Sequence, residues 1–245
     1  MFFNLEKQVK KYKIKTNELA YVGANLGQNI NEFKSLFNNP VIHLFEPQKH
    51  VFNNLKKSYS NDNSLRFYNF ALGSKASNVE MHINTNNFNQ SSSILKPTGT
   101  IDYHRGILFA GTETIEVKKF SDLKLNKVTF INIDVQGYEL EVLKGCGNAL
   151  KNIHYIMTEV NRKEMYKDCP LVKDLDKFLK DFNFIRVKTV WWDKTIPWGD
   201  ALYVKSSKVT LYNKLNSFFW NKLQSFKGYF FLLSIPKKIK NKLTY

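Results

Sequence analysis

The segment INIDVQGYELEVLKG, residues 131–145, carries the clearest structural signal in the chain. An apolar run ends at Asp134, Gly137 gives the chain room to turn, and a segment of helical character follows. The stretch therefore predicts a buried strand that leads into a helix over 138–144. Asp134 would then lie at the carboxyl end of a strand, which is where open α/β sheets bind their ligands.

The same alternation of strand and helix runs along most of the chain. Apolar runs of strand length are separated by segments whose apolar residues recur every three or four positions. Alternation at this spacing predicts a parallel sheet with helices on both faces. The expected strands are 18–22, 41–45, 65–70, 128–134, 153–160, 184–190 and 200–205, and TIEVKKF, residues 114–120, is another possible strand. The expected helices begin near Gly27 and cover 48–59, 138–144 and 171–182.

Residues 73–112 interrupt this pattern. They are rich in Ser, Asn, Thr and Gly and contain only short strand-like pieces such as VEMHI, residues 79–83. We interpret them as an insertion over the active site at the top of the sheet, which is a usual place for functional loops. The expected organisation is one domain over 1–205, with a helical lead-in over 1–18, followed by a tail over 206–245.

Composition limits the class of protein. A length of 245 residues suits one domain, and 43% hydrophobic residues suffice for a core. Cys146 and Cys169 can form no disulfide framework and lack metal-ligand spacing. The N-terminus has no uninterrupted apolar run of the secretory kind, and no stretch reaches the roughly 18 to 20 apolar residues that span a bilayer. We therefore expect a cytoplasmic protein.

A glycine turn after the first strand is the first candidate ligand site. VGANLG, residues 22–27, places two glycines where a strand becomes a helix, so that a ligand can approach the backbone and its free N–H groups. The G-x-x-x-G spacing differs from the dinucleotide fingerprint. Glu46 closes the next strand, where an acid can bind both hydroxyls of an adenosine ribose. After the third strand, Asn69 can hydrogen-bond an adenine edge, and Phe70 fits either beside the ring or, as burial statistics favour, in the core.

In chain order, VGANLGQ, LFEP, NFALGS, SSSI, INIDVQGYELEVLKG, IMTEV and GDALYVK resemble the FkbM family of S-adenosylmethionine-dependent methyltransferases. The resemblance covers roughly residues 19–205, and 131–145 is its most specific piece, similar to the family pattern I-D-V-E-G-x-E-x-x-V-L-x-G. It implies an α/β, Rossmann-like class I methyltransferase fold: a seven-stranded, mostly parallel sheet whose last strand is antiparallel, with helices on both faces. It also implies methyl transfer from S-adenosyl-L-methionine, in many members to hydroxyls of sugars or polyketide-type products.

The resemblance also implies roles for single residues. This chain has Tyr21 where the family usually has Asp, which leaves the cofactor's amino group without an acid at that position. It has Gln136 where the family usually has Glu, which removes a carboxylate from the mouth of the site. The implied cofactor contacts are Gly23, Ala24, Asn25 and Gly27 at the methionine end, Glu46 at the ribose, Asn69 beside the adenine and Asp134 near the transferred methyl.

Methyl transfer to a hydroxyl needs alignment of oxygen, methyl and sulfur, and a base near the hydroxyl helps. Asp134 is a candidate base close to the cofactor, Glu159 is a second candidate at the same sheet edge, and His104 in the insertion is the alternative base. Glu139, near a helix N-terminus, either stabilises that helix or faces the site, whereas Glu141 is expected on the helix surface. We predict no metal, since two scattered carboxylates are weak support for one.

The tail over 206–245 contains eight lysines, nine aromatic residues and no acid, and thus holds half of the net charge of +16. Leu211, Leu215, Phe218 and Leu223 recur at helical spacing and predict an amphipathic helix. Lysines together with large apolar residues are typical of a helix at a membrane interface. A solvated tail, or a helix packed on its own sheet or on a second subunit, also fits this composition.

The sequence favours O-methyl transfer to a sugar in a glycan or lipid-linked glycan, with peripheral contact at the inner membrane surface. The basic charge also allows nucleic-acid methylation, but the fourth strand ends in DVQG (134–137) and not in an Asn/Asp-Pro-Pro-aromatic run. Cys169 precedes Pro170 where a cytosine C5 nucleophile would follow a proline, so we expect no specific nucleic acid. A methyltransferase for another small molecule and a catalytically inactive, membrane-associated interaction module are further alternatives. The oligomeric state stays open.

Overall fold

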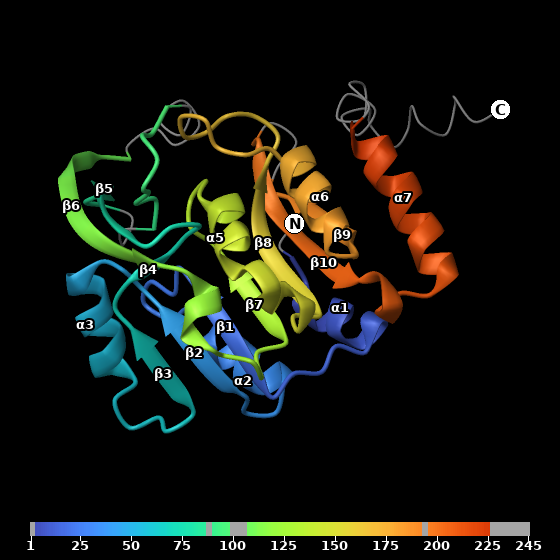
Figure 1. Ribbon diagram of the computed structural model, residues 1–245, viewed down its shortest axis with the longest axis horizontal. Helices are drawn as coiled ribbons and strands as arrows, with labels where there is room; N and C mark the ends of the chain where they lie inside the picture. Colours follow the sequence, from blue (N-terminus) through green and yellow to red (C-terminus); the bar gives the residue numbers. More distant parts are fainter. Residues whose placement is uncertain (1–2, 87–89, 99–106, 193–195, 226–245) are drawn as a thin grey trace, which may run out of the picture.

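The computed structural model describes residues 3–86, 90–98, 107–192 and 196–225. Its main sheet consists of β1 (Glu18–Val22), β2 (Val41–Phe45), β3 (Leu65–Tyr68), β7 (Phe130–Ile133), β8 (Tyr155–Asn161), β9 (Phe184–Trp191) and β10 (Trp198–Lys205). These seven strands lie in the order β3-β2-β1-β7-β8-β10-β9 (Figure 1). β10 pairs antiparallel with both of its neighbours, whereas the remaining pairs are parallel. The predicted seven-stranded sheet with an antiparallel last strand is therefore confirmed.

Helices cover both faces of this sheet, as predicted (Figure 1). Side chains alternate along each strand, so Ala20 and Val22 of β1 face one apolar cluster and Leu19 and Tyr21 face another. Strands covered on both faces are apolar throughout, which is why they were recognisable as short continuous runs. Helices α5 (Glu139–Cys146) and α6 (Val172–Asp181) cover the first face, and α1 (Leu5–Tyr12), α2 (Ile30–Leu36) and α3 (Lys49–Ser58) contribute to the second.

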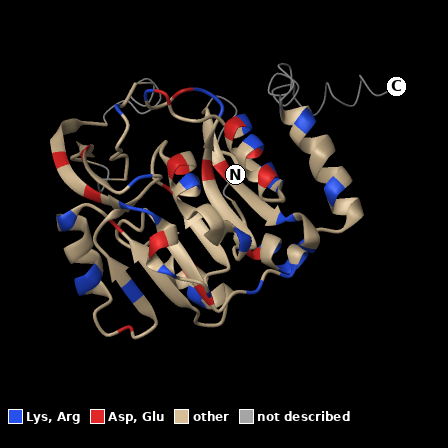
Figure 2. Ribbon diagram, viewed as in Figure 1, with Lys and Arg blue, Asp and Glu red and all other residues tan. Residues whose placement is uncertain are grey.

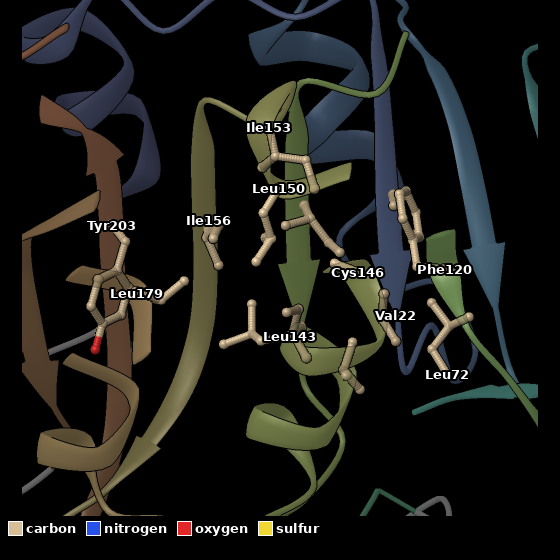
Figure 3. Close-up of a cluster of buried hydrophobic side chains, with 14 of the residues drawn as sticks. Val22, Leu72, Phe120, Leu143, Cys146, Leu150, Ile153, Ile156, Leu179 and Tyr203 are labelled. Carbon is tan, nitrogen blue, oxygen red and sulfur yellow. The ribbon is translucent and has the colours of Figure 1, made fainter. Parts of the chain in front are cut away.

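Figure 3 shows the apolar cluster on the face of α5 and α6. Leu143 and Cys146 of α5 and Leu179 of α6 are fully buried in it, together with Val22 and Ile156 of the sheet. Burial of a side chain of this size stabilises the fold by about 1.5–3 kcal/mol. The cluster lies directly under the ends of β1, β7 and β8, so the loops that follow those strands start from fixed points.

The helix after the glycine turn begins later than predicted. α2 starts at Ile30 and not near Gly27, because Asn25 and Gly27 adopt positive φ values of +46° and +83° that no helix contains. The Gly27 N–H donates to the Ala24 carbonyl in a turn instead. The residues between β1 and α2 therefore form a compact loop at the sheet edge.

A second, three-stranded sheet is an addition that the sequence did not predict. It contains β4 (Ala71–Leu72), β5 (Ser77–Asn84) and β6 (Phe109–Lys118) in the order β4-β6-β5, and it lies beside α3 (Figure 1). The strand-like piece at 79–83 belongs to β5, and its partner β6 follows only after residues 85–108. Pairing over so long a connection leaves no local signal in the sequence.

The helix predicted in the tail is α7 (Leu211–Ser225). It lies against β9 (Figure 1): Ser217 is buried, and the Asn221 side-chain amide donates to the Arg186 carbonyl at 2.8 Å. In the part of the chain that the structure describes, helices long and apolar enough to cross a bilayer are absent.

Candidate active site

A cavity of about 500 Å³ lies at the carboxyl edge of the main sheet. The ends of β1, β2, β7 and β8 border it, and the antiparallel β10 contributes its first residues at the same edge. This volume is typical of a small-molecule site. Its described wall contains the four carboxyl side chains of Glu46, Asp134, Glu159 and Asp200 and no Lys, Arg or His.

Gly23 marks the closest approach of two loops beside the cavity. Its φ is +77°, and a Cβ atom at this position would lie 1.8 Å from the carbonyl oxygen of Asp134. Only glycine fits such a place, because an L side chain would meet backbone and not a movable side chain. The predicted glycine turn and the predicted strand-end aspartate are therefore adjacent.

Glu46 connects the glycine turn to the end of β2. It is buried, and its two carboxyl oxygens accept hydrogen bonds from the backbone N–H groups of Asn25 and Gln48, each at 2.9 Å. Burial raises the pKa of Glu46 to about 7, although the two N–H donors oppose the rise. The glycine turn and the acid that the sequence paired thus lie together in the wall of the cavity.

Asn69 and Phe70 lie behind this wall. The Asn69 side-chain amide donates to the backbone carbonyls of Glu46 and Pro47, both at 3.0 Å. Phe70 is buried in the apolar cluster, with its ring centroid 5.8 Å from that of Phe45. The described cavity wall contains neither residue, so their contact with an adenine stays a prediction.

Gln136 lies between two of the carboxyl groups. Its Nε2 donates to Asp134 Oδ1 at 2.8 Å and to Glu159 Oε2 at 3.1 Å. Its Oε1 accepts from the Tyr166 hydroxyl at 2.9 Å, which assigns the amide orientation. The replacement of the family's usual glutamate does more than remove a carboxylate, because the amide supplies a donor that an ionised glutamate lacks.

Asp134, Glu159 and Asp200 form a group that we call the acid cluster. Glu159 and Asp200 are opposite each other in the β8–β10 register, and Asp134 is the most open of the three to the cavity. Desolvation by the cavity walls raises the pKa of each, that of Asp200 to about 7. The Gln136 amide opposes the rise at both Asp134 and Glu159, but the neighbouring charges of Asp134, Glu139 and Asp200 raise the pKa of Glu159 further. Asp134 therefore ionises more readily than Glu159.

The two acids of α5 have different positions. Glu139 is buried, and its Oε1 accepts from the backbone N–H groups of Val135 and Gly137, so it stabilises the turn after β7 from beneath. It does not belong to the described cavity wall. Glu141 lies on the outer side, where it accepts hydrogen bonds from Ser74 and Lys144, as expected for a residue on the helix surface.

Part of the segment over 73–112 also borders the cavity. Ser91, Ser92 and Ile94 contribute to the wall, and the Ser93 hydroxyl donates to the Gln136 carbonyl at 2.7 Å. The alternative base His104 lies outside the described residues. Among the residues that are described, His, Cys, Asp and Glu form no group of three or more with a geometry suited to a metal ion.

Sequence reasoning missed several polar residues of the site, among them Asn161, Tyr166 and Asp200. Asp200 could have been predicted from the sequence, because an antiparallel last strand begins at the edge where the parallel strands end. Asn161 closes β8 two residues after Glu159, and a polar residue at the end of a buried strand is a usable signal. Tyr166 had no such signal, because its position depends on the loop after β8.

The strand order, the antiparallel strand between β8 and β9 and a cavity beside the glycine turn define a class I S-adenosylmethionine-dependent methyltransferase. The profile of the family described as "Methyltransferase FkbM domain" matches residues 22–186, and the chain belongs to this family. Its cofactor is S-adenosylmethionine. The residues fit that cofactor, since a glycine turn, a buried acid at the end of β2 and carboxyl groups suited to a sulfonium cation border one cavity.

Two curated relatives and one solved structure are similar to the chain. It is 23% identical over 174 residues to the 2-O-methyltransferase NoeI of Sinorhizobium fredii, covering 67% of this chain and 71% of that protein. It is 29% identical over 66 residues to the hexuronic acid methyltransferase AglP of Haloferax volcanii, covering 24% of this chain and 28% of that protein. The methyltransferase FkbM structure from Methylobacillus flagellatus KT matches with a TM-score of 0.53 at 16% identity, over 78% of this chain and 44% of that one. This chain therefore spans less than half of the solved FkbM chain, and that likeness shows the fold.

Proposed function

We propose that the protein transfers the methyl group of S-adenosylmethionine to a hydroxyl of a sugar. The observation that carries this proposal is one continuous cavity, which extends from Glu46 and the glycine turn to the acid cluster and two tryptophans, Trp192 and Trp198. A cofactor at the first end brings its methyl near Asp134, where an acceptor entering from the other end meets it. The names of the two curated relatives support O-methyl transfer and a sugar acceptor.

The cofactor end offers a contact for each part of the cofactor. The loop with Gly23 and Asn25 takes the methionine portion, and Glu46 takes the ribose hydroxyls. Tyr21 borders the cavity, and burial raises its pKa, so its phenol keeps a proton and can donate where the family usually has an acid. When bound, the cofactor supplies an electrophilic methyl group on a sulfonium.

Asp134 is the proposed base. The Asp134 carboxylate would accept the hydroxyl proton as the acceptor oxygen takes the methyl group, and the cofactor would leave as the neutral thioether, with the electron pair of the broken carbon–sulfur bond on sulfur. Asp134 suits this role because it ionises more readily than Glu159 and is open to the cavity. Alignment of the three reacting atoms provides much of the rate, and a base contributes roughly 10²–10⁴-fold.

The test is methyl transfer from labelled S-adenosylmethionine to glycan and lipid-glycan extracts, followed by identification of the product. We expect label in a sugar methyl ether, and we expect Asp134→Asn to lower kcat by roughly 10²–10⁴-fold with cofactor affinity within a few-fold of the wild type. Label only in nucleic acid or protein would contradict the proposal. Absence of cofactor binding in calorimetry would favour the inactive interaction module.

We further propose that α7 brings the enzyme to an anionic membrane surface. Five of its large side chains are more than 60% exposed and lie within about a third of the helix circumference. Lys214 and Lys222 are the charged residues on this helix, and Figure 2 shows no acid on it. Apolar side chains and lysines on one exposed helix face fit a bilayer that contains anionic lipid. The five side chains are Leu211, Tyr212, Leu215, Phe218 and Phe219.

Flotation on vesicles tests this placement. We expect the full chain to float with vesicles of phosphatidylglycerol and phosphatidylcholine, to float less with phosphatidylcholine alone, and to lose binding on Phe218→Ser with Phe219→Ser. Leu108→Ser is the matched control, because Leu108 is 62% exposed but lies far along the chain from α7. Equal flotation by the double variant, or none by the wild type, overturns the proposal. If the exposed face of α7 binds a second copy of the chain and not a membrane, sedimentation would show a dimer.

A further inference from the structure

The far end of the cavity from Glu46 has a distinctive charge. Three of the four carboxyl groups in the described wall belong to the acid cluster, which extends from Asp134 beside the glycine turn to Glu159 and Asp200 on β8 and β10, and the same described wall contains no basic side chain. The guanidinium of nearby Arg162 lies over the Trp191 ring, 4.6 Å from its centroid, and donates to the Ile196 carbonyl. An acceptor that enters this end therefore meets carboxyl groups.

A further carboxylate is costly to bind at this place. Glu159 and Asp200 already hold protons more tightly than ordinary carboxyl groups, because each is desolvated and each lies near the negative charge of Asp134. A bound sugar acid would have to bring a proton with it or raise these pKa values further. An uncharged ring has no such cost, and the carboxyl groups offer its hydroxyls hydrogen-bonding partners.

Asn161 is the second observation. It closes β8, borders the cavity and is 1% exposed. Among the described residues, its side-chain Nδ2 and Oδ1 are both buried without a hydrogen-bonding partner. A buried polar atom without a partner costs about 1–3 kcal/mol, so an amide with two such atoms is expected to have a ligand. One donor and one acceptor on adjacent atoms match two neighbouring hydroxyls.

Aromatic side chains complete this end. Trp192 and Trp198 both border the cavity, and Trp192 is half exposed. The apolar faces of sugar rings stack on indoles, and this contact does not depend on the charge of the ring. The tryptophans thus favour a sugar ring as the ligand, whereas the carboxyl groups and the Asn161 amide determine which sugar ring binds.

We propose that this end of the cavity is an acceptor subsite for uncharged sugar rings, in which the acid cluster excludes sugar acids and the Asn161 amide positions the ring through its hydroxyls. The inference rests on the proposed sugar methyltransferase activity and narrows its substrate class. It separates this chain from AglP, which is named for hexuronic acid and to which the similarity is limited to 66 residues.

The first experiment compares acceptors in matched pairs. Methyl hexopyranosides and the methyl hexopyranosiduronates of the same ring configuration are assayed with labelled S-adenosylmethionine, beside the product isolated from glycan extracts. At pH 8 we expect kcat/KM to be at least about tenfold higher for the neutral member, and the preference to shrink at pH 6 as the carboxyl groups take up protons. A uronate as the preferred acceptor overturns the inference and leaves the proposed function intact. Label in no sugar at all overturns both.

Asp200 provides the specificity variant. Asp200→Asn removes one charge of the acid cluster while keeping size and hydrogen-bonding capacity, and we expect the neutral-to-uronate ratio of kcat/KM to fall by roughly fivefold or more. Glu116→Gln is the control, because Glu116 is exposed on β6 and does not belong to the described cavity wall. An unchanged ratio in Asp200→Asn contradicts charge exclusion.

Asn161→Leu separates a ligand contact from a structural role. The change keeps the branched arrangement of the side-chain heavy atoms and removes the unpaired amide, so we expect the acceptor KM to rise about tenfold, the cofactor Kd to stay within twofold and Tm to stay equal or rise. Asn84→Leu is the control for loss of a side-chain amide that does donate hydrogen bonds within the protein. The buried Asn84 amide donates to Asn86 and to the Leu108 carbonyl, so its removal should lower Tm. A lower Tm with an unchanged acceptor KM in Asn161→Leu overturns the assignment. Asn161→Ala gives the same two readouts if the leucine variant fails to fold.

Discussion

Substitutions of the single residues Gly23 and Gly111 distinguish two effects of glycine, its tolerance of a positive φ and its lack of a side chain at a close contact. Both have positive φ, +77° and +82°, but a Cβ at Gly23 would collide with the Asp134 carbonyl, whereas one at Gly111 has nothing within 4 Å. We expect Gly111→Ala to cost about 1–2 kcal/mol of unfolding free energy from backbone strain alone. Gly23→Ala should cost clearly more and abolish cofactor binding, because the two loops must separate. Urea unfolding and calorimetry measure both, and equal losses would contradict the close approach.

Glu46 supports a second prediction at this scale. Glu46→Gln removes a charged acceptor of the ribose hydroxyls and relieves a carboxyl group buried at some cost, so stability and affinity should change in opposite directions. We expect cofactor affinity to fall about 10–100-fold, the amount that one or two charge-assisted hydrogen bonds provide. Tm of the cofactor-free protein at pH 8 should stay equal or rise, because relief of the buried charge offsets the loss of one backbone N–H hydrogen bond that the amide nitrogen cannot accept. Glu141→Gln, on the outer side of α5, is the control and should leave the affinity unchanged.

The positions of Glu46 and Asp134 at the cavity were predictable because each residue comes directly after a buried strand, whereas their roles stay predictions. The contacts of Gln136 were not predictable, because its hydrogen bonds depend on which atoms the folded chain brings close to its side-chain amide. It bridges Asp134 and Glu159, which are 25 positions apart, and is oriented by Tyr166, a further seven along. The sequence showed the departure from the family pattern there but not its consequence.

At the scale of elements, one buried ion pair joins α6 to β9. The Arg186 guanidinium binds both Asp176 carboxyl oxygens at 2.8 and 2.9 Å, and the Tyr203 hydroxyl donates to the same carboxylate. Arg186 is nearly fully buried, so Asp176→Ala leaves a charge without its partner and should cost about 2–4 kcal/mol, discounted for the partly exposed carboxylate. Glu6→Ala, which breaks the exposed Glu6–Lys10 pair, should leave the free energy of unfolding almost unchanged. Denaturant unfolding checks both, and similar losses would contradict the assignment.

Local sequence patterns were sufficient to predict most elements of the main sheet. The strands and helices of the main sheet were predictable, since apolar runs and helical periodicity are local properties and the alternation fixes parallel pairing. The β4-β6-β5 sheet was not, because β5 and β6 find each other across residues 85–108. α7 was predictable as an amphipathic helix, but which of its faces contacts β9 depends on Ser217 and Asn221, two polar residues that hydropathy assigns to solvent.

The stability of the protein depends on pH because buried carboxyl groups in and beside the cavity have raised pKa values. Glu46, Glu139 and Asp200 have pKa values raised to about 7, mainly by burial, whereas the unfolded chain releases these protons near pH 4 to 4.5. Between these values the folded state binds more protons, so the free energy of unfolding should fall as pH rises from about 4.5 to 7 and level off above. Each unit of pKa difference corresponds to about 1.4 kcal/mol.

Variants isolate this contribution from other titrating groups. Other groups change the stability in the opposite sense: burial lowers the pKa of His43, for example, so that His43 contributes more stability as pH rises. The informative quantity is therefore the difference between wild type and a Glu46→Gln, Asp200→Asn double variant. We expect the double variant to gain most at pH 8 and little at pH 4.5, measured by urea unfolding at half-unit steps. Bound cofactor should shrink this gain, because its sulfonium stabilises the ionised carboxyl groups that the substitutions remove. A gain that is equal at both pH values would mean that the carboxyl groups around the cavity hold no extra protons, and the charge argument for both the base and the acceptor subsite would lose its basis.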